Sequence, residues 1–130
     1  MSEPIWVRRD VLELLHDESI AEHGGASGLR DSGLFESALA RPKNLLLYEG
    51  IEDIARLVAC YAFGLAKNHA FVDGNKRVAF IAAGLFLRLN GLRLLADQVD
   101  ATLTFLSLAA GTIDEQQLAE WIRKNSVSLK

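Results

Sequence analysis

Residues 68–77, with the sequence NHAFVDGNKR, bring an imidazole, a carboxylate and two cations into one short segment. His69 carries the side chain best suited to general base catalysis near neutral pH. Asp73 offers a hard carboxylate oxygen, which Mg²⁺ binds together with phosphate oxygens. Lys76 and Arg77 add positive charge. These residue types predict a site for a phosphate-bearing ligand.

The same segment joins the end of one expected helix to the start of the next. Free backbone N–H groups at a helix start bind anions, and Gly74 allows a ligand to approach that backbone closely. Lys76 and Arg77 would lie in the first turn, where positive charge opposes the helix dipole. That cost is tolerated more readily if an anion binds there.

The charge distribution supports this interpretation. The chain has 14 Lys+Arg and 17 Asp+Glu, which disfavours a protein that binds nucleic acid mainly through its phosphates. Residues 67–77 carry a net charge of +2, which leaves −5 for the rest of a chain whose net charge is −3. Neither a Walker A loop nor a dinucleotide-binding glycine motif is present, and no His/Cys cluster predicts structural zinc.

Each feature alone has an ordinary explanation. His69 could cap or pack a helix end, residues 73–75 could form a plain turn, and Lys76 and Arg77 could lie on a solvated face. The functional interpretation is favoured because all of them occur within nine residues at one helix–loop–helix junction.

The composition predicts one domain over residues 1–130. The chain is 50% hydrophobic and 24% charged, as is typical of a soluble globular protein. No apolar run reaches the ~18 residues that cross a bilayer, and the first ten residues lack a signal-peptide core. We therefore expect a cytoplasmic protein without a membrane partner. The single cysteine, Cys60, lies among apolar residues and is expected to be a buried, inert thiol.

The spacing of apolar residues predicts an all-α domain. Gly24 to Arg30 is expected to form a loop or short hairpin, and Pro42 to end the second helix. Thr112 and Glu115 match a capping box. Residues 78–89 are apolar on most sides and should form the central helix, and residues 92–95 a brief extended piece. The expected helices span approximately residues 7–23, 32–41, 52–69, 78–89, 99–110 and 113–122.

Residues 69–77 resemble the signature of the Fic/Doc superfamily, His-x-Phe-x-Asp/Glu-Gly/Ala-Asn-x-Arg. The resemblance continues in residues 23–31 and 85–91 and covers about residues 10–125. Lys76 is similar to the Doc branch, the "death on curing" toxins of toxin–antitoxin pairs. The resemblance implies a compact domain of about six helices with a loop or hairpin flap.

The resemblance also implies roles for single residues. His69 would take the proton from a target hydroxyl, and Asp73 would hold Mg²⁺ on the phosphates of ATP. Phe71 would anchor the loop in the core. Gly74 and Asn75 would form an anion nest for the nucleotide. Arg77 would clamp a phosphate and Lys76 would add positive charge, and both would belong to the catalytic as well as the nucleotide-binding residues.

Lys76 bears on the type of reaction. Fic enzymes that transfer AMP usually have a small glycine there, which leaves room for the α-phosphate. In Doc the nucleotide is reversed, so the γ-phosphate faces the acceptor and the enzyme is a kinase of elongation factor Tu that stops translation. Ile81 departs from relatives with a polar residue near the nucleotide. An AMP-transferase and a non-catalytic nucleotide- or partner-binding module therefore stay alternatives.

Regulation is expected to come from a second protein. Self-inhibiting Fic proteins carry Ser/Thr-x-x-x-Glu-Gly/Asn, but Leu45 precedes Glu49 and Gly50 here. The resemblance implies a separately encoded, Phd-like antitoxin. We expect its C-terminal segment to fold as an amphipathic helix in a groove beside the loop from Gly24 to Arg30, with Arg30 as a charged contact.

Overall fold

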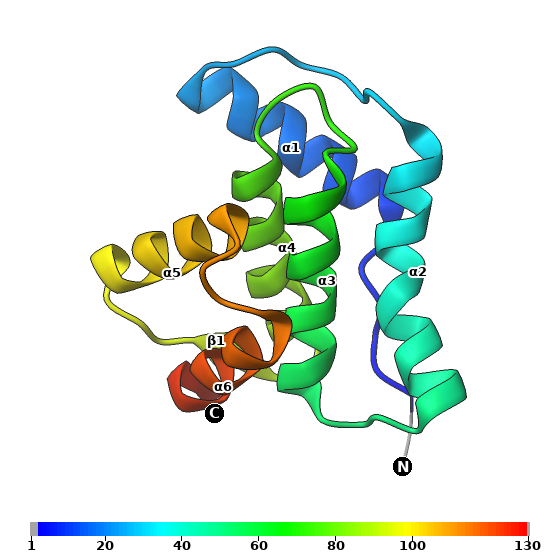
Figure 1. The fold of residues 1–130 in the computed structure, drawn as a ribbon, viewed down its shortest axis with the longest axis vertical. Coiled ribbons are helices and arrows are strands. Elements are labelled where there is room, and N and C mark those ends of the chain that lie inside the picture. The colour runs from blue at the N-terminus through cyan, green and yellow to red at the C-terminus, as the bar shows by residue number, and fades with distance from the viewer. Residues whose placement is uncertain (1–2, 130) are drawn as a thin grey trace.

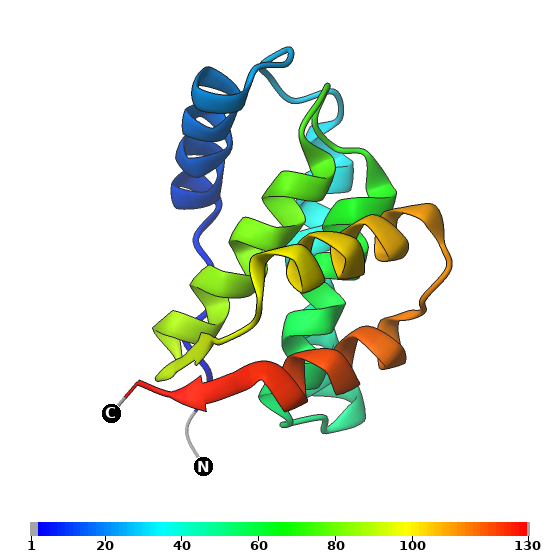
Figure 2. The ribbon, with the colours of Figure 1, turned by 90° about the vertical axis from the view of Figure 1, so that its left-hand side faces the viewer.

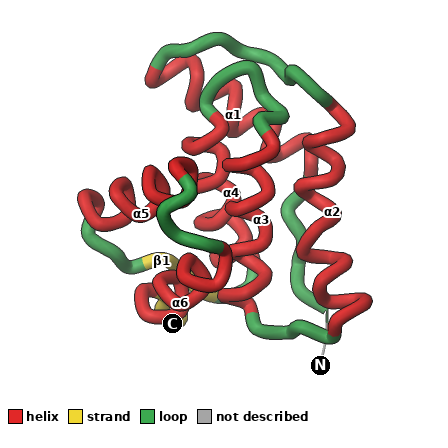
Figure 3. Tube along the Cα trace, viewed as in Figure 1, coloured by secondary structure: helices red, strands yellow, loops and turns green. Residues whose placement is uncertain are grey.

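The computed structural model describes residues 3–129, which form a bundle of helices with one small sheet (Figures 1 and 3). This confirms the expected all-α domain of about six helices. Within the described residues, no helix is long and apolar enough to span a membrane. The elements are α1 (Arg9–His23), α2 (Ser32–Glu49), α3 (Ile54–Asn68), α4 (Asn75–Leu89), β1 (Leu92–Leu94), α5 (Gln98–Ala110), α6 (Glu115–Asn125) and β2 (Ser126–Ser128).

Helix α3 is the centre of the bundle. It packs against α2, α4, α5 and α6, whereas α1 lies on α4 (Figures 1 and 2). Ten of the 15 residues of α3 are buried, against six of 15 in α4. The expectation that residues 78–89 form the central helix is therefore wrong. Small residues on α3 explain the difference, because a Cβ on Gly64 would already lie 3.4 Å from the Cβ of Ala38 on α2.

Cys60 lies on the buried face of α3. Burial raises the pKa of its thiol to about 12, so the thiolate that a nucleophile requires does not form near neutral pH. The expectation of a buried, inert thiol is confirmed.

Helix α2 continues through Pro42 instead of ending before it. A proline inside a helix removes one backbone hydrogen bond and crowds the preceding turn. Pro42 is itself buried, however, and the apolar stripe extends on both sides of it, with Phe35 buried before it and Leu45 packed against the core after it. Packing on both sides of the proline offsets its local cost.

The last helix begins at a different cap from the one expected. The Asp114 carboxylate accepts from the backbone N–H of Gln117 at 2.7 Å, and the Gln117 side chain accepts from the Asp114 N–H at 2.8 Å. Thr112 instead donates its hydroxyl to the carbonyl of Ser107 on α5. The capping box is therefore Asp114 with Gln117, and the Thr112–Glu115 assignment is wrong.

A two-stranded antiparallel sheet, formed by β1 and β2, lies at the end of the bundle near the C-terminus (Figures 2 and 3). The extended piece expected at residues 92–95 is present as β1, where Arg93 lies opposite Val127 of β2. The second strand, Ser126–Ser128, was not expected, because three residues give no readable alternation.

The position of the cap can be tested by stability measurements. We expect Asp114→Ala to lower the free energy of unfolding by about 1 kcal/mol, the usual cost of losing a helix N-cap. Thr112→Ala should cost less, because that hydroxyl does not cap α6. Urea denaturation of both variants measures the difference, and a larger loss for Thr112→Ala would contradict the assignment.

Candidate active site

The connection between α3 and α4, residues 69–74, is here called the signature loop. It lies at one end of the bundle, next to the connection between α1 and α2 (Figures 1 and 2). His69 caps α3 in the left-handed backbone region, with φ 53° and ψ 46°. A residue other than glycine rarely adopts this conformation, and such strain gathers at functional sites. The His69 side chain is exposed.

Phe71 and Asn75 fix the shape of the signature loop. The Phe71 side chain is only 2% exposed and packs edge-on against Phe35, as expected for an anchor. The Asn75 side chain accepts from the Phe71 N–H at 3.1 Å and donates to the Phe71 carbonyl at 3.0 Å. The Asn75 side chain therefore closes the loop. Only the backbone N–H of Asn75 is left to contribute to the predicted anion nest.

The segment from Gly24 to Arg30, here called the flap loop, pairs with the signature loop. Leu29 and Phe71 form an isolated antiparallel bridge, in which the Arg30 N–H donates to Ala70 at 2.7 Å and the Val72 N–H donates to Gly28 at 3.0 Å. Of the two alternatives expected here, the structure shows a loop and not a hairpin. The flap loop needs no hairpin of its own, because its backbone groups bond to the signature loop instead.

Arg30 is part of this connection. Its guanidinium donates to the carbonyls of His69 at 2.7 Å and Asn68 at 3.3 Å, which are the carbonyls left without partners at the end of α3. Cationic side chains stabilise helix C-termini in this way. Arg30 therefore supports the position of His69 rather than standing free as a contact for a partner protein.

The Asp73 carboxylate is exposed and oriented by two backbone groups. Oδ1 accepts from the N–H of Gly74 at 2.8 Å, and Oδ2 lies 3.4 Å from the donating N–H of Ala26. A Cβ placed on Gly25 would lie 2.6 Å from Oδ2. The flap loop thus approaches the carboxylate as closely as glycine allows.

The start of α4 has the features of an anion site. Gly74 is its N-cap, no side chain caps it, and the first hydrogen bond of the helix is from Val78 to Gly74. In the part of the chain that the structure describes, the N–H groups of residues 75–77 make no hydrogen bond. Lys76 is exposed and pairs with none of the described residues. The Arg77 guanidinium donates to the carbonyls of Gly24 and Ser19, so it is partly committed to the end of α1.

These residues line one hollow of about 690 Å³, here called the signature hollow. All the sequence-predicted site residues from His69 to Arg77 contribute to it, with the anchor Phe71 excepted. The opposite wall comes from α5 and was missed by sequence reasoning, because no local motif marks it. Lys67 holds that wall through a hydrogen bond to the carbonyl of Ala109 at 3.4 Å. The wall consists of Leu106, Ala109 and Ala110.

The donor set suits Mg²⁺ bound together with a nucleotide. Asp73 is the one carboxylate in the lining of the signature hollow. Among the described residues, no three or more His, Cys, Asp or Glu side chains gather into a metal cluster. Mg²⁺ usually takes one or two carboxylates and completes its shell with phosphate oxygens and water. Asp73 beside the open start of α4 therefore fits a magnesium–nucleotide complex.

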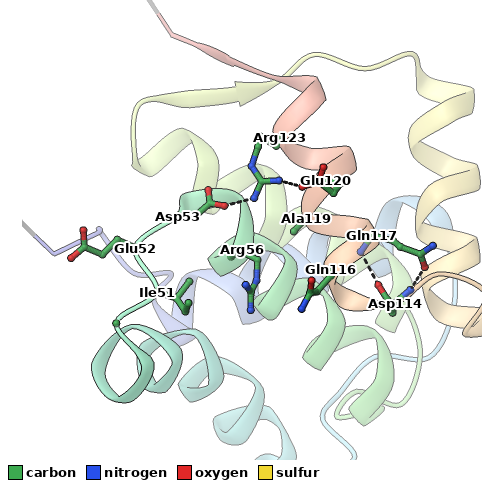
Figure 4. A pocket seen from close by; sticks show the side chains of 11 residues that line it. Ile51, Glu52, Asp53, Arg56, Asp114, Gln116, Gln117, Ala119, Glu120 and Arg123 are labelled. Carbon is green, nitrogen blue, oxygen red and sulfur yellow. Dashed lines mark hydrogen bonds and ion pairs between the residues drawn. The ribbon is translucent and has the colours of Figure 1, made fainter.

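A second hollow, between the start of α3 and helix α6, is polar, and several of its charged groups bond to one another (Figure 4). The buried Nε of Arg56, which also lines it, has no hydrogen-bond partner among the described residues. Arg123 forms ion pairs with both Asp53 and Glu120. Asp114 is occupied by the capping box of α6. The signature hollow, with an exposed histidine and an uncapped helix start, is the better candidate for an active site, because the second hollow has neither.

The fold and the site define a small helical domain in which an exposed histidine faces the open start of a helix. A sequence model of the Fic/DOC family matches residues 6–87, and the chain belongs to that family. It is 36% identical over 110 residues to the protein kinase doc of Escherichia phage P1, which covers 85% of this chain and 86% of the relative. It is 46% identical over 77 residues to the toxin Doc of Mycolicibacterium smegmatis, covering 57% and 58%. The expected family is confirmed.

The close approach of the flap loop to Asp73 can be tested with two matched glycine variants. Gly25 and Gly28 have similar backbone angles, φ 113° and φ 106°, so alanine is strained at both. Only Gly25→Ala also meets the Asp73 carboxylate, because nothing lies within 4 Å of a Cβ at Gly28. We expect Gly25→Ala to weaken Mg·ATP binding by about tenfold or more relative to Gly28→Ala, a loss comparable to one charged hydrogen bond. Isothermal titration measures both affinities, and equal losses would contradict the contact.

Proposed function

We propose that this chain is the toxin of a type II toxin–antitoxin pair and acts as a protein kinase. One observation carries the proposal: an exposed histidine, an oriented carboxylate and an unpaired lysine surround the open start of α4 in a single hollow. The names of the two relatives, a protein kinase and a toxin, support it. The proposed cofactors are ATP and Mg²⁺. The proposed target, from the family resemblance, is a hydroxyl of elongation factor Tu in the cytoplasm.

The proposed reaction is transfer of the ATP γ-phosphoryl group to that hydroxyl. His69 takes the hydroxyl proton as the oxygen forms its bond to the γ-phosphorus, the bond to the β–γ bridging oxygen breaks, and ADP leaves. The N–H groups at the start of α4 and the Lys76 ammonium stabilise the negative charge on the phosphoryl oxygens. Mg²⁺ held by Asp73 would neutralise charge between the phosphates.

Lys76 favours the kinase over the AMP-transferase. The Lys76 side chain is exposed at the hollow and pairs with none of the described residues, so its charge is available to a nucleotide. By the family resemblance, Lys76 replaces the small glycine that leaves room for an α-phosphate in Fic enzymes that transfer AMP. We therefore propose that the γ-phosphate lies nearest His69.

The role of His69 is tested best with His69→Asn. Asparagine tolerates the left-handed backbone conformation that His69 adopts, so this variant removes the base without adding strain. We expect phosphoryl transfer to fall by ~10²–10⁴-fold, the usual contribution of general base catalysis. Mass spectrometry of elongation factor Tu after incubation with Mg·ATP measures the product.

The mass increment also separates the two possible reactions. An added phosphate supports the kinase, whereas an added AMP would overturn it in favour of the alternative. Transfer by His69→Asn at the wild-type rate would refute the role of His69. The melting temperature of the variant is the control, and it should match that of the wild-type protein.

We also propose where a Phd-like antitoxin binds. An apolar groove runs between the end of α1, helix α4 and helix α5, beside the flap loop. Phe80 and Leu106 are 41% and 44% exposed there, although both are large and apolar. Lys76 lines both this groove and the signature hollow. An amphipathic helix in the groove would therefore abut the nucleotide site, and Lys76 rather than Arg30 is the cation that it meets.

Growth of cells that express the chain tests this surface. Expression alone should arrest growth, and co-expression with the neighbouring open reading frame should restore it. Phe80→Glu should escape this neutralisation because it places a charge in the groove. Leu47→Glu is the matched control, since Leu47 is 72% exposed on α2 and lies outside the groove. Equal growth in all cases, with active enzyme confirmed, would contradict the proposal.

A further inference from the structure

His16 is an ionisable residue in the interior of the fold, far from the signature loop in sequence but in contact with it in space. Its side chain is 1% exposed on the inner face of α1. The imidazole Nε2 lies 2.7 Å from the carbonyl oxygen of Asp73. The ring stacks on Phe71, with centroids 3.9 Å apart and planes inclined by 23°.

The chemistry of the two ring nitrogens identifies the direction of this hydrogen bond. A carbonyl oxygen only accepts, so Nε2 must carry a hydrogen and donate the hydrogen bond to the Asp73 carbonyl. Nδ1 is buried and makes no hydrogen bond among the described residues, and the carboxylate of Asp17 is 3.9 Å away. A buried polar atom without a partner costs stability. Stacking on Phe71 does not itself require a histidine, because other flat side chains stack on an aromatic ring. What histidine adds at this position is the Nε2 donor to the Asp73 carbonyl.

The bonded carbonyl belongs to the peptide unit between Asp73 and Gly74. That unit is planar and trans, so its C=O and N–H point in opposite directions. With the carbonyl held by His16, the N–H of Gly74 points to the Asp73 carboxylate, to which it donates at 2.8 Å. If this peptide rotated by half a turn, its carbonyl would face the Asp73 carboxylate and repel it, and the carboxylate would lose the N–H that orients it. Glycine makes that rotation easy, because Gly74 at φ 77° has access to both hands of backbone space.

We propose that His16 is a positioning residue that holds the Asp73–Gly74 peptide in the orientation in which its N–H bonds to the Asp73 carboxylate. The inference rests on the proposed nucleotide site and names a residue that supports it from outside the signature. The His16 imidazole bonds to the backbone carbonyl of Asp73 and not to the Asp73 carboxylate. It acts on the peptide that orients the carboxylate and begins α4. His16 packs closely against this glycine, since a Cβ on Gly74 would lie 3.3 Å from Nε2.

Two substitutions separate this role from simple packing. His16→Phe keeps the ring stacked on Phe71 but removes the donor. His16→Gln removes the ring but places an amide N–H near the position of Nε2. We expect His16→Phe to weaken Mg·ATP binding by about tenfold or more, which corresponds to the loss of one buried hydrogen bond. His16→Gln should bind within about threefold of the wild-type protein, because its donor is retained.

Isothermal titration with Mg·ATP, melting temperatures and amide hydrogen exchange at Gly74 are measured on all three proteins. The proposal predicts faster exchange at this amide in His16→Phe and wild-type exchange in His16→Gln. Unchanged affinity and exchange in His16→Phe would overturn it. Equal losses in both variants, in proportion to a fall in melting temperature, would also overturn it. If the wild-type protein does not bind Mg·ATP, the proposed function fails, and hydrogen exchange alone then decides the role of His16.

Discussion

The burial of Phe71 is the constraint on which the site depends. Its side chain lies between the rings of Phe35 and His16, and its backbone N–H and C=O are both bonded to Asn75. With one residue of a six-residue connection fixed in side chain and backbone, the residues on either side have little freedom. His69 and Asp73, two residues before and two after the anchor, are consequently exposed and line the same hollow as the open start of α4.

Three cations at the site stabilise helix ends, and a fourth is left free. Arg30 bonds to the last carbonyls of α3, Arg77 to carbonyls at the end of α1, and Lys67 to a carbonyl near the end of α5. Each offsets the negative end of a helix dipole, so three helices converge on the signature hollow without an uncompensated charge. Lys76 makes no such bond among the described residues, and it is the cation available to a ligand.

The sequence predicted most of the helices and every residue of the signature, because apolar spacing and a dense local motif are both readable along the chain. The errors arose where tertiary packing outweighs local preference, as at Pro42, or where two caps compete, as at Thr112 and Asp114. The supporting residues were not predictable in the same way. His16 and the α5 wall reach the site only through the fold. The one local sign of His16 is its place four residues after Leu12 and four before Ile20, on the buried face of α1.

The most direct test of the account is a crystal structure of the chain with Mg²⁺ and a non-hydrolysable ATP analogue. The account predicts the metal on the Asp73 carboxylate, a phosphate on the N–H groups at the start of α4, and the γ-phosphate nearest His69. An α-phosphate nearest His69 would contradict the proposed kinase. A nucleotide bound outside the signature hollow would contradict the site itself.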